Sequence, residues 1–222
     1  MGAPRTARSD APRPGVRAVL FDFGGVLSAS PFEAFARYER ERNLPEGFIR
    51  SLNATDHHEN AWARLERNEI TLGRFIELFE AEAEAAGHRI DGAAVLSLLG
   101  GEIRPRMLQA VERCRERYLV GLLTNNFLTA EAAEHPGGAI DRVLSLFHEV
   151  IESSKIGVRK PEVRFFEIAC ERLGIEPHEA VFLDDLGINL KPARAMGMTT
   201  IKVVTEDQAL SDLGEVVGLD LS

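Results

Sequence analysis

Four widely separated segments of the chain carry side chains that are common in catalytic sites. Among them are three carboxylates, a hydroxyl, an amide and an ammonium group. Taken singly, each has an ordinary structural explanation, since an Asp or Asn after an apolar run is often a turn former or a helix cap. The segments are Asp22-Phe23-Gly24-Gly25, Thr124-Asn125-Asn126, Gly157-Val158-Arg159-Lys160-Pro161, and Asp184-Asp185 with Asn189 four residues beyond.

Together these groups indicate one kind of chemistry. Asp22, Asp184 and Asp185 would repel one another if gathered in one place, which raises the pKa of at least one carboxyl unless a cation neutralises them. Mg²⁺ suits such a site, because it typically takes one or two carboxylates together with water and substrate phosphate. Lys160 and Thr124 would supply the charge and orientation that a transferring phosphoryl group requires.

The four segments can meet only if they follow neighbouring strands of one sheet. Strands that alternate with helices predict an α/β fold with a mainly parallel sheet and helices on both faces. Such a sheet binds ligands beyond the carboxyl ends of its strands. Apolar, β-branched runs predict five strands, at Val16–Phe21, Leu119–Leu123, Glu149–Ile151, Ala180–Leu183 and Thr200–Val204. Helical faces are predicted from Met107, Val111, Cys114 and Tyr118, and from Phe166, Ala169, Cys170 and Leu173, with Pro161 opening the second helix and Gly174 closing it.

Residues 31–100 interrupt this alternation with amphipathic helices alone. Leu72, Phe75, Ile76 and Phe79 follow helical spacing, and Thr71 is placed to cap that helix. We therefore expect a core domain at 16–30 and 101–222, with 31–100 as a helical subdomain above the sheet. Residues 1–15, rich in Pro and Arg, are expected to be a disordered leader.

Composition excludes several classes of partner. A net charge of −9 argues against nucleic acid or an anionic membrane surface, because either requires clustered Lys and Arg. There is no apolar run long enough to cross a bilayer, and Met1 to Gly15 lack the apolar centre of a signal peptide. Both cysteines, Cys114 and Cys170, fall on predicted apolar helix faces. These features predict a cytoplasmic protein without disulfides.

The four segments also match, in order, the four motifs of the haloacid dehalogenase (HAD) superfamily. The stretches that carry the resemblance are VLFDFGGVL, LLTNNF, GVRKPEVRFFEIACERLGI and AVFLDDLGINLKPARAMGMTTIKV. Core and cap together cover nearly the whole chain from Arg17 onward. The chain resembles the N-terminal phosphatase domain of soluble epoxide hydrolase, bacterial sugar-1-phosphate phosphatases, and the HAD domain fused to some acyl-CoA dehydrogenases, which shares the Gly-Gly first motif. The resemblance implies a Rossmann-like core with a helical cap inserted after the first strand.

The resemblance also implies a set of metal ligands. Asp22 would be both the nucleophile and a ligand of Mg²⁺. The backbone carbonyl of Gly24 and the carboxylate of Asp185 would be further ligands, and Asp184 would act directly or through water. The expected cofactor is therefore Mg²⁺.

The remaining motif residues would bind the substrate, a small phosphorylated metabolite. Thr124 and Asn125 would hold phosphoryl oxygens, while Lys160 would orient Asp22 and offset the negative charge. Attack of Asp22 on phosphorus would give an aspartyl-phosphate that water then hydrolyses. The resemblance thus implies a Mg²⁺-dependent phosphomonoesterase.

One position departs from the pattern of most phosphatases in this superfamily. They carry a second Asp two residues after the nucleophile as general acid and base, and this chain has Gly24 there. General acid–base catalysis is typically worth about 10²–10⁴-fold in rate. The departure predicts a slow enzyme, a substrate with a good leaving group, or a proton donor from elsewhere, for which Asp56-His57-His58-Glu59 in the insertion is a candidate.

Two other functions fit parts of the sequence. A haloacid dehalogenase uses an Asp nucleophile without a metal or a protonated leaving group, which agrees with Gly24. The retained pair Asp184-Asp185 favours a phosphatase, because two anions would repel a carboxylate substrate. A binding or regulatory module that has lost turnover through Gly24 is the alternative from another class, although every other chemical position is intact.

Overall fold

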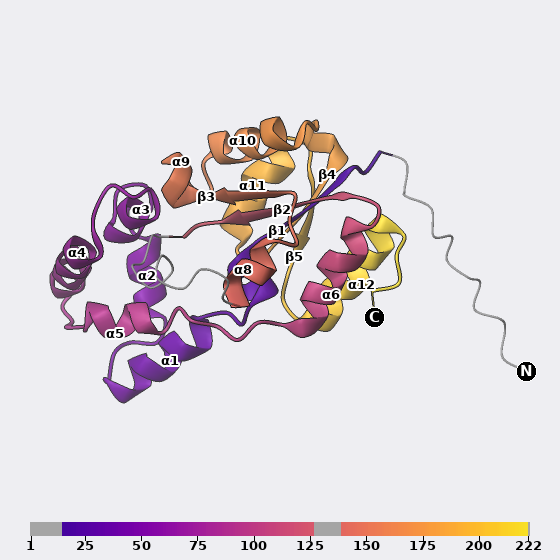
Figure 1. The fold of residues 1–222 in the computed structure, drawn as a ribbon. Coiled ribbons are helices and arrows are strands. Elements are labelled where there is room, and N and C mark those ends of the chain that lie inside the picture. The colour runs from indigo at the N-terminus through magenta and orange to yellow at the C-terminus, as the bar shows by residue number, and fades with distance from the viewer. Residues whose placement is uncertain (1–14, 127–138, 222) are drawn as a thin grey trace, which may run out of the picture.

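The computed structural model describes residues 15–126 and 139–221, so the predicted leader at 1–15 lies almost entirely outside the described residues (Figure 1). A five-stranded sheet with the order β3-β2-β1-β4-β5 forms the centre, and every pair of neighbouring strands is parallel. The predicted α/β fold is therefore confirmed. The strands are β1 (Ala18–Phe21), β2 (Leu119–Thr124), β3 (Glu149–Glu152), β4 (Ala180–Asp184) and β5 (Thr199–Lys202).

The period-2 geometry of the strands divides the core into two apolar layers. Val19 and Phe21 of β1 face one cluster, which includes residues of α6 and α12, while Ala18 and Leu20 face the other, with α10 and α11. Figure 1 shows helices on both sides of the sheet. They are α6 (Pro105–Arg115), α8 (Ala139–Leu144), α9 (Ser153–Ile156), α10 (Val163–Leu173), the single turn η2 (Pro177–Glu179), α11 (Gly187–Ala195) and α12 (Glu206–Val217).

The boundaries of α10 follow from its sequence. Gly174 ends it with the left-handed backbone expected of a C-cap glycine, at φ 63°. The predicted start at Pro161 is wrong by two residues, because the helix begins at Val163 after Glu162. Pro161 lies just outside the helix, in the loop that carries Lys160.

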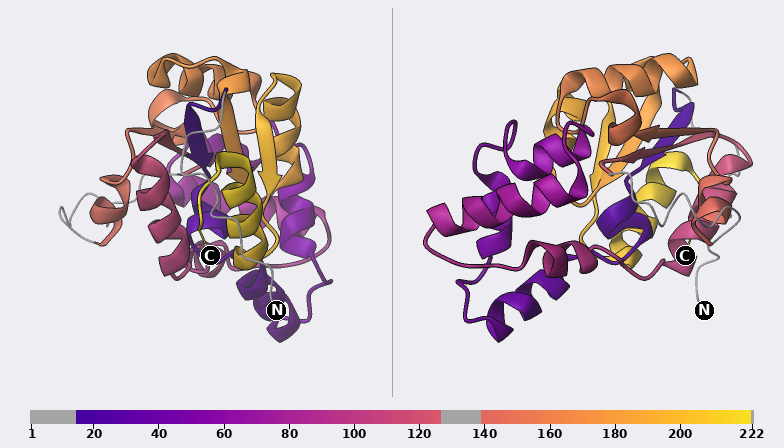
Figure 2. Two further views of the ribbon diagram at one scale, coloured as in Figure 1. Left: turned by 90° about the vertical axis from the view of Figure 1, so that its right-hand side faces the viewer. Right: turned by 60° about the vertical axis from the view of Figure 1, so that its left-hand side comes forward.

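A separate set of helices surrounds its own apolar cluster, which includes Phe75 and Phe79. Thr71 caps the longest of them, accepting a hydrogen bond from the backbone N–H of Arg74, as predicted. Figures 1 and 2 show these helices gathered on one side of the molecule, apart from the sheet and its covering helices. They are α1 (Phe32–Glu41), α2 (Phe48–Ala54), α3 (Ala61–Glu66), α4 (Leu72–Ala85) and α5 (Gly92–Ser97), hereafter the cap.

Two adjacent chain segments connect the cap to the core. Ser28 on the way out forms an antiparallel bridge with Ile103 on the way back. The backbone N–H of Ala29 donates to the carbonyl of Glu102 at 2.8 Å. We keep the boundaries 16–30, 31–100 and 101–222 as a proposal that the separate apolar clusters support. In the part of the chain described, no helix has the length and apolar character that crossing a membrane requires.

Candidate active site

Asp22 lies immediately after the central strand β1, at the carboxyl edge of the sheet. It is 8% exposed, and its backbone N–H continues the sheet by donating to the carbonyl of Leu183 at 3.0 Å. Its Oδ1 accepts hydrogen bonds from the backbone N–H of Phe23 at 2.7 Å and from Nζ of Lys160 at 2.8 Å. The carboxylate is therefore held in one orientation at the edge where ligands bind in such sheets.

Lys160 is a buried cation between two carboxylates. Its side chain is 1% exposed, and its Nζ lies 2.8 Å from Oδ1 of Asp22 and 2.9 Å from Oδ2 of Asp184. Burial by itself lowers the pKa of the Lys160 ammonium, but the charges of Asp184 and Asp22 and their hydrogen bonds raise it above its ordinary value. Lys160 therefore stays charged at neutral pH.

Asp184 is bonded on both of its oxygens. Its Oδ2 accepts from Lys160, its Oδ1 accepts from the backbone N–H of Leu186 at 2.7 Å, and Nδ2 of Asn189 lies 3.1 Å and 3.0 Å from the two oxygens. The side chain is fully buried. A buried carboxylate with this many donors is a rigid anchor for the ammonium of Lys160.

Asp185, by contrast, has little stabilisation of its charge. Burial and repulsion from Asp184 raise the pKa of its carboxyl to about 6, although the charge of Lys160 and a hydrogen bond from Oγ of Ser30 at 3.4 Å act in the opposite direction. Burial and the charge of Asp184 likewise raise the pKa of Asp22 well above its ordinary value, although Lys160 acts in the opposite direction. Two carboxylates here are thus short of positive charge.

The three acids form a cluster that could hold a metal ion. One oxygen from each of Asp22, Asp184 and Asp185 lies within 4.8 Å of the others. Lys160 supplies a single positive charge to this set, whereas three carboxylates carry three negative charges. A divalent cation with a preference for oxygen would neutralise the remainder, so the residues present fit Mg²⁺.

The loop after Asp22 contains two glycines, and the second allows Asp185 to approach the loop closely. Gly24 has an extended backbone at φ −69° and ψ 129°, which any residue can adopt. Gly25 has φ 76°, and a Cβ built there would lie 2.2 Å from Oδ2 of Asp185. Arg104 fixes the loop from outside by donating from Nη1 to the carbonyl of Gly25 at 2.9 Å.

Thr124 and Asn125 follow at the end of β2, as the sequence predicted. Thr124 is half-buried and pairs in register with Glu152 of β3. The amide of Asn125 brackets the backbone of Lys160: its Oδ1 accepts from the Lys160 N–H and its Nδ2 donates to the Lys160 carbonyl, both at 2.9 Å. Asn125 thus positions Lys160, while phosphoryl binding by Thr124 and Asn125 stays a prediction.

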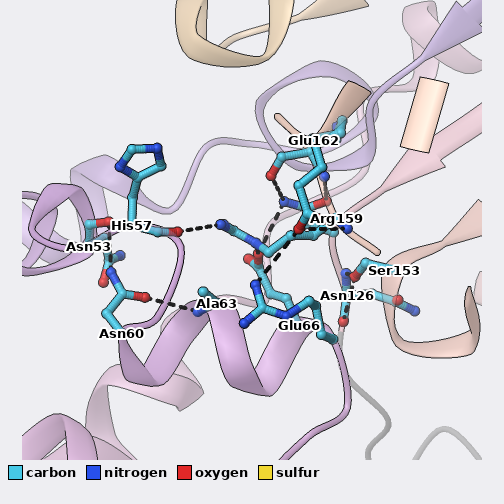
Figure 3. A network of polar contacts seen from close by, with 12 residues as sticks. Asn53, His57, Asn60, Ala63, Glu66, Asn126, Ser153, Arg159 and Glu162 are labelled. Carbon is cyan, nitrogen blue, oxygen red and sulfur yellow. Dashed lines mark hydrogen bonds and ion pairs between the residues drawn. The ribbon is translucent and has the colours of Figure 1, made fainter. Parts of the chain in front are cut away.

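Several polar contacts of this site were not predicted from the sequence. Glu66, on α3 of the cap, accepts from Arg159 and from Asn125, and Arg159 also donates to the carbonyl of His57 at 2.8 Å (Figure 3). Ser30 and Arg104 belong to the segments that join cap and core. None of these residues lies near the motif it contacts in sequence, so local pattern gave no signal. Asn189, in contrast, could be recognised in the sequence from its spacing of four residues from Asp185.

Comparison with known proteins places this chain in one family. The model of the haloacid dehalogenase-like hydrolase family matches residues 16–197. The match spans well over half of the chain, and the chain belongs to this family of hydrolases. The resemblance expected from the four segments is therefore confirmed.

Several curated proteins are similar along most of the chain. Acyl-CoA dehydrogenase family member 10 of Mus musculus is 36% identical over 212 residues, which are 92% of this chain and 19% of that protein. Bifunctional epoxide hydrolase 2 of Sus scrofa is 32% identical over 221 residues, 93% of this chain and 40% of that protein. The chain thus spans only part of the length of these relatives. A phosphatase of Mycobacterium tuberculosis is 28% identical over 216 residues, 90% of this chain and 95% of that protein.

Solved structures share the fold. A HAD family enzyme of Bacteroides thetaiotaomicron, in complex with magnesium and inorganic phosphate, has a TM-score of 0.58 at 21% identity over 86% of this chain and 96% of that one. A dehalogenase has a TM-score of 0.64 at 20% identity, over 93% of this chain and 99% of that one. Both support the Rossmann-like core of this family.

Proposed function

We propose that this hydrolase is a Mg²⁺-dependent phosphatase that acts on a small phosphorylated metabolite through an aspartyl-phosphate on Asp22. The observation that carries the proposal is the buried Lys160, which joins the carboxylates of Asp22 and Asp184 at the edge of the sheet. A carboxylate that is oriented by an ammonium, beside further acids, suits phosphoryl transfer. The similarity to a phosphatase of M. tuberculosis over nearly its full length supports the proposal.

The metal would be held by Asp22, Asp185 and the carbonyl of Gly24. Asp184 would contact it through water, because both of its oxygens already accept hydrogen bonds from the protein. Bound Mg²⁺ would supply the positive charge that the acid cluster lacks and would draw the phosphoryl oxygens toward Asp22.

The side chains of this chain have defined parts in the reaction. The carboxylate of Asp22 attacks phosphorus as the bond to the leaving oxygen breaks, and the leaving group departs as an anion that solvent water protonates afterwards. Water then attacks the acyl phosphate, which releases inorganic phosphate and restores Asp22. Lys160 keeps Asp22 oriented and offsets charge throughout, while Thr124 and the Asn125 segment bind the phosphoryl oxygens.

The absence of an acidic side chain at position 24 restricts the kind of leaving group that the substrate can have. Because Gly24 offers no side chain to protonate the leaving oxygen, we propose a substrate whose leaving group departs as an anion, such as an acyl, aryl or anomeric phosphate. The similarity to acyl-CoA dehydrogenase family member 10 prompts the hypothesis that the substrate is a phosphorylated acyl or hydroxyacyl compound. The stretch Asp56-His57-His58-Glu59 is a candidate proton donor to test. Its link to the site is the carbonyl of His57, which accepts a hydrogen bond from Arg159, the neighbour of Lys160.

A phosphate-release screen with Mg²⁺ tests the proposal. It would compare acyl, aryl, sugar 1- and hydroxyacyl phosphates. We expect turnover that is lost on chelation of the metal and abolished in Asp22→Asn, which keeps the size of the side chain. Circular dichroism would check that the variant is folded. Turnover confined to sugar phosphates would discard the acyl hypothesis.

The same preparation separates the other two functions. Halide release from a 2-haloacid without added metal would identify a dehalogenase. That function agrees with Gly24, because a dehalogenase needs no acid to protonate the leaving group. Binding of a phosphorylated compound with no release of phosphate, in wild type and Asp22→Asn alike, would identify a binding module. Either result would replace the phosphatase proposal.

A further inference from the structure

The cap contacts the loop that carries Lys160 through two neighbouring residues at the end of α3. Oε2 of Glu66 lies 2.5 Å from Nε of Arg159 and 3.0 Å from Nδ2 of Asn125. Nη1 of the next residue, Arg67, lies 3.7 Å from Oε1 of Glu162. Both contacts join cap to core. Glu66 contacts Asn125, whose amide bonds the Lys160 backbone, whereas Glu162 contacts the backbone N–H of Arg159, at 3.4 Å.

A continuous series of polar contacts joins Glu66 to the nucleophile Asp22. Asn125 donates from the same Nδ2 to the Lys160 carbonyl and accepts from the Lys160 N–H, and Lys160 donates from Nζ to Asp22. Because the Asn125 amide has one rigid plane, the acceptor that fixes one of its N–H groups also fixes the orientation of its oxygen. Glu66 thus adds a third hydrogen bond to the amide that makes both hydrogen bonds on the Lys160 backbone.

The surroundings of this carboxylate strengthen the coupling. The side chains of Glu66 and Arg159 are only 16% and 13% exposed. Hydrogen bonds that involve charged groups in such places are stronger than neutral ones and less screened by water. Figure 3 shows Arg159 reaching across from the core to Glu66 and His57, so the cap holds this side chain at two points.

We propose that Glu66 is a positioning residue, which makes the alignment of Lys160 depend on docking of the cap. When the cap is docked, Glu66 orients Asn125 and Arg159 on either side of Lys160, and the ammonium is set against Asp22. When the cap moves away, Asn125 loses its outer acceptor and Lys160 loses this constraint. The kinetic part of this inference rests on the proposed phosphatase activity.

Glu66→Ala and Arg67→Ala form a matched pair of variants. Each removes one cap–core ion pair at adjacent positions, and Arg67→Ala also removes the ion pair of Arg67 with Glu69 inside the cap. Glu66→Gln restores an acceptor oxygen without the charge. We expect Glu66→Ala to lower kcat more than it raises KM, by up to about 10²-fold. Glu66→Gln should recover part of this loss, and Arg67→Ala should keep kcat near the wild-type value.

A double-mutant cycle tests whether Glu66 acts through Asn125. In an Asn125→Ala background, Glu66→Ala should have much less effect on kcat than in the wild type, because the shared path is already broken. Additive effects of the two substitutions would overturn the proposal. So would equal losses in Glu66→Ala and Arg67→Ala.

Amide hydrogen exchange gives a readout that needs no turnover. The Lys160 N–H donates to Asn125, so it should exchange faster in Glu66→Ala and at the wild-type rate in Arg67→Ala. Unchanged exchange in both would refute the positioning role even if the enzyme is an active phosphatase. Faster exchange in Glu66→Ala alone would support it even if no phosphatase activity were found.

Discussion

Replacement of Gly25 by Ala should damage the metal site by direct contact with Asp185. The added Cβ would lie 2.2 Å from Oδ2, 2.4 Å from Cγ and 3.0 Å from Cβ of Asp185. Ordinary contacts between carbon atoms lie at about 3.5–4.0 Å, so the carboxylate must move by on the order of 1 Å or more. The contact includes the stem of the side chain, so a change of rotamer alone does not relieve it.

The backbone adds a second cost. Gly25 has φ 76°, where a side chain costs about 1–2 kcal/mol relative to glycine. For a chain of this size, that lowers the melting temperature by about 2–8 °C. Displacement of Asp185 should also weaken Mg²⁺ binding by at least about 10–100-fold, the usual effect of disturbing the surroundings of a metal.

Thermal unfolding and calorimetric titration with Mg²⁺ measure the two effects separately. Gly24→Ala is the matched control for stability, because Gly24 has a negative φ and no atom within 4 Å of a built Cβ. Its melting temperature should equal or slightly exceed that of the wild type. If Gly25→Ala binds Mg²⁺ as tightly as the wild type, the assignment of Asp185 as a ligand is wrong.

Three further predictions concern other parts of the site and the cap. Gly24→Asp, for which the structure has space, should raise the rate on alkyl phosphates by up to about 10²–10⁴-fold; a flat or lower rate contradicts our account of the missing acid. Asn189→Leu removes the amide from both oxygens of Asp184 and should lower the free energy of unfolding in urea by about 1–3 kcal/mol; a neutral effect would mean that Asp184 needs no such donor. Asn60→Ala removes the N-cap of α3, whose Oδ1 accepts from Ala63, and should cost about 0.5–2 kcal/mol; an unchanged melting curve would count against this cap.

The starts of β2 and β4, the two neighbours of the central strand, were well predicted. Leu119 and Ala180 were placed at the starts of β2 and β4, where the structure has them. The ends of the predicted strands β1 and β5 were less accurate. The first strand was expected to begin at Val16, but its pairing begins at Ala18, which lies opposite Leu119 and Ala180. The two neighbouring strands therefore determine where the pairing of β1 begins.

The last strand shows the same effect at its other end. It was predicted as Thr200–Val204, but β5 spans Thr199–Lys202. Val203 is buried and donates its N–H to the carbonyl of Asp184, and Val204 is 73% exposed. An apolar run gives the burial of a segment but not the residue at which a strand leaves its sheet.

The site was predictable where a residue follows a strand and not where contacts cross between subdomains. Asp22, Lys160, Asp184 and Asp185 meet because parallel strands end at a common edge. Glu66 meets Asn125 only because of how the cap packs on the core. No local periodicity encodes a contact between residues so far apart in sequence, so such partners are found only from coordinates.

The antiparallel bridge of Ser28 with Ile103 has an evolutionary consequence. Both ends of the insertion leave the core at the same point. The sheet therefore does not constrain the length or shape of the segment inserted between them. The inserted helices, and with them the substrate preference, can therefore be exchanged without a change in the sheet, provided that the new cap keeps an acceptor for Asn125. Selection can then act on recognition in the cap and on chemistry in the core, with Glu66 as the contact between the two.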